Sequence, residues 1–102
     1  MDLVTFHELT TELEGVRRTD PDGLARWSYH GRLVARELDA THVVLRAELD
    51  VRDLLVAQSP AVFTVPRRFE KHMMVVVDLA AGDDGAVEDA LTAAWRLQVA
   101  GD

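Results

Sequence analysis

The stretch from residue 73 to residue 99 constrains the fold of this chain more than any other. It begins with five apolar residues at 73–77, three of them valines, and breaks at 82–85 in the sequence Gly-Asp-Asp-Gly. After the break, apolar residues recur at helical spacing: Val87, Ala90, Leu91, Ala94 and Trp95. β-Branched residues favour strands, so we expect a buried strand followed by a closing helix whose first turn is capped by the two Asp residues.

The rest of the chain predicts further elements of the same kinds. An apolar stripe from Leu3 to Val16 indicates an opening amphipathic helix that ends near Gly15, and residues 19–23 have turn chemistry. Strands are expected at 25–29, 33–38, 42–47, 61–65 and 72–79, with a helix at 51–58 capped by Asp50. The prediction is a single α+β domain over 1–102, a two-layer α/β arrangement with one antiparallel sheet of about five strands. The expected order of elements is α-β-β-β-α-β-β-α.

Composition and charge narrow the functional classes. The chain has 102 residues, 48% of them apolar, which suits one globular domain. Its formal net charge of −7 repels polyanions at long range, so any nucleic-acid contact has to be local. Cys is absent, the first residues carry an acid, Asp2, where a secretory leader would carry basic residues, and no apolar run approaches a membrane span. We therefore expect a cytoplasmic protein without a membrane partner.

A basic cluster follows the fourth expected strand. Arg67, Arg68, Lys71 and His72 lie close together in a connecting loop, where they could grip phosphates while Phe69 stacks on a base. Two further arginines on the three-stranded meander, Arg32 and Arg36, could extend this surface. The alternative is that Phe69 packs against the edge of the core and that its charged neighbours are only solvated.

The strand at 72–79 is apolar on both faces. Met73, Val75 and Val77 lie on one face, and Met74 and Val76 on the other. If three helices cover one face of the sheet, Met74 and Val76 either form a local apolar patch or contact a partner. That partner could be a second copy of the chain, in a homodimer.

Catalytic and metal-binding signatures are absent. The sequence has no nucleophile elbow, Gly-rich phosphate loop or zinc-protease motif. Its four histidines share no helical i,i+4 spacing, which argues against a metal site. We expect neither an enzyme nor a cofactor.

Four short strings resemble the MmcQ/YjbR family. They are Leu-Glu-Gly-Val at 13–16, His-Gly-Arg-Leu-Val-Ala at 30–35, Ser-Pro-Ala-Val-Phe at 59–63 and Ala-Trp-Arg-Leu at 94–97. The family pattern has Pro where Glu14 stands, Lys and Phe where Arg32 and Leu33 stand, Trp near Met73, and often a basic tail. The resemblance implies a two-layer domain of the DNA-binding, double-wing kind, with a fold that is also similar to that of secretion chaperones.

Two functions of different classes follow. The first is weak binding of DNA or another nucleic acid through the local basic loop, at Arg67, Arg68, Lys71, His72, Arg32 and Arg36. The alternative is a protein-interaction or chaperone-like module that uses the sheet surface around Met74 and Val76 without catalysis.

Overall fold

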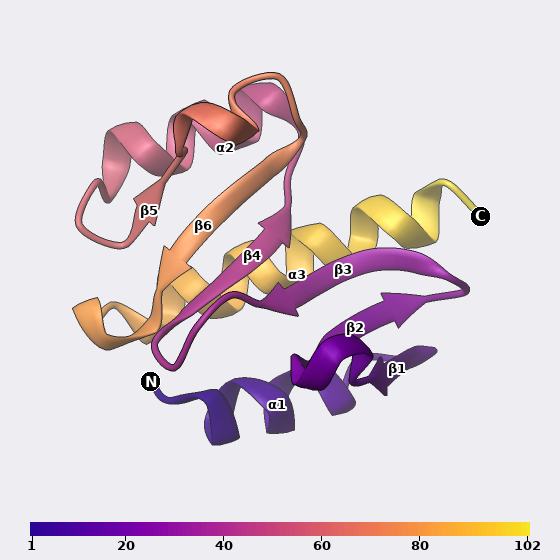
Figure 1. Ribbon diagram of the computed structural model, residues 1–102. Helices are drawn as coiled ribbons and strands as arrows, with labels where there is room; N and C mark the ends of the chain where they lie inside the picture. The colour runs from indigo at the N-terminus through magenta and orange to yellow at the C-terminus, as the bar shows by residue number, and fades with distance from the viewer.

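One antiparallel sheet of six strands forms the frame of the protein (Figure 1), seen in a computed structural model that describes all residues, 1–102. The elements in chain order are α1 (Leu3–Thr11), β1 (Val16–Thr19), β2 (Arg26–Tyr29), β3 (Arg32–Glu37), β4 (His42–Arg46), α2 (Leu49–Gln58), β5 (Phe63–Thr64), β6 (Met74–Asp78) and α3 (Asp84–Ala100). Short 3₁₀ turns lie between them, of which η2 (Arg67–Phe69) matters below. The strand order is β1-β2-β3-β4-β6-β5, and every pairing is antiparallel. The predicted α+β class with one antiparallel sheet is confirmed.

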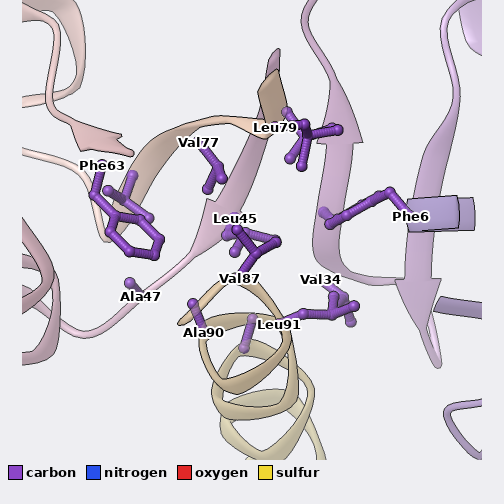
Figure 2. Packing of buried hydrophobic residues seen from close by; sticks show 14 of the residues in the cluster. Phe6, Val34, Leu45, Ala47, Phe63, Val77, Leu79, Val87, Ala90 and Leu91 are labelled. Carbon is purple, nitrogen blue, oxygen red and sulfur yellow. The ribbon is translucent and has the colours of Figure 1, made fainter. Parts of the chain in front are cut away.

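The helices supply the layer that closes one face of the sheet. Residues from α1, α3 and the strands make one buried cluster, against which side chains of α2 also pack. Figure 2 shows Leu91 of α3 beside Val34 and Val87 beside Leu45, with Ala90 on the side of Ala47 and Phe6 of α1 entering from the side. Val87 and Leu91 are almost fully buried, as expected from their spacing in the sequence. Asp83 caps α3, since its carboxylate accepts the amide of Ala86.

The sheet has one strand more than the sequence predicts. The apolar stripe predicted an opening helix that ends near Gly15, but α1 ends at Thr11. Gly15 has φ +77° and lies so close to the Tyr29 ring that a Cβ there would be 2.6 Å from the ring. The chain turns at this glycine, and residues 16–19 then pair with β2 as the edge strand β1.

Two other boundaries differ from the predicted ones. The helix α2 begins at Leu49 after Glu48, so Asp50 lies in its first turn and is not the cap. Asp50 accepts only the amide of the next residue, Val51. The strand β5 is reduced to two residues, because the amides of Val62 and Phe63 both bond to the carbonyl of Ser59 in a turn.

Candidate nucleic-acid interface

The sheet face turned away from the helices, called the open face below, is defined by one row of paired residues. The row crosses all six strands as Thr19, Arg26, Arg36, Val44, Val76 and Thr64. Directly paired residues point to the same side of a sheet, and their neighbours along each strand point to the other side. Consistently, Leu45 and Val75 belong to the helix-covered cluster, whereas Val44 and Val76 belong to a separate small one.

The half of the open face over β1, β2 and β3 is polar and basic. Arg26 and Arg36 are direct cross-strand partners, and Arg17 of β1 pairs with Ser28 of β2. The Nε of Arg26 donates to the Oγ of Ser28 at 3.3 Å, which places both side chains on this face. A shallow depression of about 620 Å³ lies here, and none of its lining residues is hydrophobic: Gly15, Arg17, Thr19, Arg26, Ser28, His30 and Gly31.

These arginines have no carboxylate partner in the protein. The three Arg side chains that form ion pairs are Arg18, Arg32 and Arg52. Arg26 and Arg36 therefore carry like charges on directly opposed positions, an arrangement that destabilises a sheet. An anion bound between them would relieve this repulsion.

Acidic residues lie mainly on the helices and in the loops. The helices or their first turns carry Glu8, Asp50, Asp53, Asp84, Glu88 and Asp89. The net charge of −7 is therefore unevenly distributed. The helices on one side of the sheet carry many acidic side chains, whereas Arg26 and Arg36 lie without ion pairs on the other side. Over a Debye length of about 10 Å, an approaching polyanion responds to the local face more than to the distant helices.

The other half of the open face is covered by the chain itself. Phe69 of η2 packs on Val44 and Val76 and is only 8% exposed. The guanidinium groups of Arg36 and Arg68 lie 5.7 Å and 4.8 Å from the centre of its ring. Of the two alternatives for Phe69, packing against the sheet is confirmed, and stacking on a base is wrong because the ring is already covered.

A buried arginine holds this covering turn in place. Arg52 of α2 is 9% exposed, and its Nη1 donates to the backbone carbonyls of Phe69, Glu70 and His72 at 3.0–3.3 Å. Its Nε donates to the carboxylate of Asp53 at 3.1 Å. Arg52 thus links α2 to the connection between β5 and β6, and it fixes the position of Phe69 and its neighbouring arginines.

The residues predicted for nucleic-acid binding divide into two groups. Arg67, Arg68, Lys71 and His72 all lie exposed in the β5–β6 connection, and Arg36 joins Arg68 across the Phe69 ring. Arg32 lies apart from these residues, so its predicted place in the nucleic-acid surface is corrected. Its Nη1 donates to the carbonyl of Gln98 at 2.9 Å and lies 3.8 Å from Asp102, so it binds the C-terminal end of α3 on the helix-covered side.

Two basic residues of the open face, Arg17 and Arg26, were not among the predicted set. Arg17 was missed because β1 itself was missed. Arg26 had a usable signal, since Arg26 and Ser28 alternate with the aromatic residues Trp27 and Tyr29 in β2. Such alternation is typical of a strand with one buried and one exposed face.

The proposed partner residues Met74 and Val76 face the same small cluster. Val76 is 4% exposed beneath Phe69, and Met74 is half-buried beside it. Of the two alternatives for Met74 and Val76, a local apolar patch or a partner contact, these contacts agree with the local patch. A partner surface at Val76 needs correction, because the chain's own Phe69 already covers that side chain.

Three of the four histidines make side-chain hydrogen bonds. His30 lies 2.9 Å from Asp102, His42 lies 2.9 Å from Asp39, and the Nδ1 of His7 accepts from the Trp27 indole at 3.1 Å. Nowhere do three potential ligands from His, Asp and Glu converge as a metal would require. None of the helices is both long and apolar enough to cross a bilayer.

Comparison with known proteins adds no relative: no family model, curated protein or solved structure matches the chain. The resemblance to the MmcQ/YjbR family stays a prediction. The observed order of elements agrees with the order predicted from the residue patterns, apart from the additional strand β1.

Proposed function

We propose that the protein binds nucleic acid through the basic half of its open face. The observation that carries the proposal is the cross-strand pair of Arg26 and Arg36, flanked by Arg17 and by Arg68 of η2, with no ion pair to any of them. Neighbouring strands are about 4.8 Å apart, so these side chains form a dense row of cations. Phosphate oxygens are the natural partners of such a row.

The chemistry of this face favours the backbone of the nucleic acid over its bases. Proteins that hold single strands combine a basic groove with exposed aromatic platforms. Here Phe69 is covered and Trp27 lies in the core, so neither ring is a free platform for a base. We therefore expect binding without sequence preference, and tighter binding to duplex DNA than to a single strand of equal length because the duplex carries more charge per unit length.

A salt titration of fluorescence anisotropy with a labelled duplex tests the proposal. The affinity should fall with salt at a logarithmic slope of about −3, as three phosphate contacts would give. In the variant Arg26→Gln/Arg36→Gln, the slope should shrink by about 2 because two contacts are lost.

The matched control is Arg18→Gln/Arg96→Gln, which removes the same number of positive charges away from the open face. Arg18 lies over Trp27 and pairs with Asp20, and Arg96 lies on α3. This control should bind DNA with nearly the wild-type slope. Equal losses in both variants would mean that only the net charge matters, and the open face would lose its assigned role.

The protein-interaction alternative also has one observation in its favour, but at a different place from Met74 and Val76. An apolar groove lies between α2 and α3 on the helix-covered side of the molecule.

A further inference from the structure

The groove between α2 and α3 has the most hydrophobic lining of the depressions on the surface. It has a volume of about 330 Å³, and most of its lining is hydrophobic. Val51 and Leu55 of α2 form one wall, and Ala93, Leu97 and Ala100 of α3 form the other. The small alanines on the α3 wall leave room for an inserted side chain.

The same surface also presents side chains that project into solvent. The protein has five exposed large hydrophobic residues, and three of them are on the ten-residue helix α2: Leu49 at 46%, Val51 at 37% and Leu54 at 55%. Leu54 follows Val51 by three positions, so it lies on the helix surface next to the groove. The molecule thus carries a hydrophobic projection and an apolar depression side by side.

The charges at the rim of the groove have opposite signs on opposite walls. Glu48, at the start of α2, and Arg96 of α3 both line the groove. Neither forms an ion pair within the chain, and both are exposed. A partner surface with an acid opposite Arg96 and a base opposite Glu48 would match both, and a second copy of this chain related by a two-fold axis offers that arrangement.

We infer that the protein forms a two-fold homodimer in which Leu54 of each copy inserts into the α2/α3 groove of the other. A two-fold interface requires one patch to contain both the projection and the depression, and this patch does. The exposed leucine and valine beside the groove favour a protein partner over a small ligand, which would leave them in water. The open face lies on the opposite side of the sheet, so this dimer and DNA binding are independent.

Sedimentation velocity over a wide range of protein concentrations tests the dimer. The wild type should pass from monomer to dimer as concentration rises, and Leu54→Glu should weaken association at least tenfold because it buries a charge in an apolar groove. Leu54 is more than half exposed in the monomer, so this change should leave the fold intact. The matched control is Val4→Glu on α1, at a residue 67% exposed, which should dimerise like the wild type.

A charge exchange separates a second copy from any other occupant. Arg96→Glu should weaken the dimer severalfold, and adding Glu48→Arg in the same chain should restore it, because both copies then carry the exchanged pair. A protein that stays monomeric at the highest concentration overturns the inference. It is also overturned if Leu54→Glu has no effect, if the exchanged pair fails to restore association, or if Met74→Ser abolishes the dimer while Leu54→Glu does not.

Discussion

The two faces of the sheet share the same strands but differ in what covers them. The helix-covered face buries a cluster of 17 hydrophobic residues, whereas the open face buries only Val44, Val76 and Phe69. The first face is completed by long helices and the second by a single turn, η2. Stability therefore comes mainly from one face, and the other is free to hold arginines whose mutual repulsion the fold tolerates.

Because the two faces are covered so differently, substitutions on them should have different effects. Changes on the helix-covered face should be measured mainly as losses of stability, because they open cavities in a packed core. Changes on the basic half of the open face should alter binding with little loss of stability. Four predictions test this division, in order of decreasing magnitude.

The largest effect is expected from two phenylalanines on opposite faces. Phe63→Ala removes a ring from the main cluster and should reduce the free energy of unfolding by about 3–5 kcal/mol. Phe69→Ala removes a ring that contacts only the small cluster and should cost roughly 1.5–3 kcal/mol. Urea unfolding measures both, and equal losses would contradict the division between the faces.

The next effect concerns the link between α2 and η2. Arg52→Met leaves three backbone carbonyls without their charged donor and should cost about 2 kcal/mol. It should also expose Phe69, which NMR of its ring protons would detect. Arg67→Met, at an exposed residue of the same connection without an ion pair, serves as control and should change stability by less than about 0.5 kcal/mol. An Arg52 variant as stable as this control would show that the turn holds itself.

A smaller and opposite effect is expected on the open face. Arg26→Glu places a carboxylate directly across from Arg36 and should raise the free energy of unfolding by about 0.2–1 kcal/mol. The same change should weaken DNA binding, so that stability and affinity move in opposite directions. Thermal unfolding and anisotropy on one preparation check both, with Arg18→Glu as a control of equal charge change. A variant that lost both stability and affinity would show that the pair is not strained.

The smallest effect appears in acid, at the turn between β3 and β4. Hydrogen bonds from the Thr41 amide and the His42 side chain hold the pKa of Asp39 below its ordinary value of 3.8. Because this pKa is lower in the folded state, its stabilisation is present above about pH 4 and is lost as pH falls through the folded value. The stability difference between wild type and Asp39→Asn should therefore shrink in acid. A difference that is constant from pH 6 to pH 2.5 would contradict this cause.

Much of the fold follows from local sequence patterns, and the elements that these patterns did not predict have physical reasons. β6 is a run of apolar, mostly β-branched residues and α3 is long and strongly periodic, so their types were predictable. β1 was not, because Val16 continues the apolar stripe of α1, and only the tight approach of Gly15 to Tyr29 ends that stripe. β1 exists through pairing with β2, which is a tertiary contact and not a local preference.

The candidate site was less accessible to sequence reasoning because it is assembled by register. Arg26 and Arg36 are ten positions apart and become partners only through a β-bulge, near Trp27 and Ser28, that shifts the pairing of β2 and β3. Arg32, four residues before Arg36, is carried to the other side of the sheet and binds α3. No local pattern marks Arg52 as buried, because its burial depends on a turn that lies 17 to 20 positions away.

The most direct test of the central claim is a map of amide chemical shifts during titration with an unlabelled DNA duplex. We expect the shifts to concentrate in β1, β2, β3 and η2, and to become much smaller in Arg26→Gln/Arg36→Gln at the same DNA concentration. Shifts confined to α2 and α3, or an unchanged map in that variant, would contradict nucleic-acid binding by the open face.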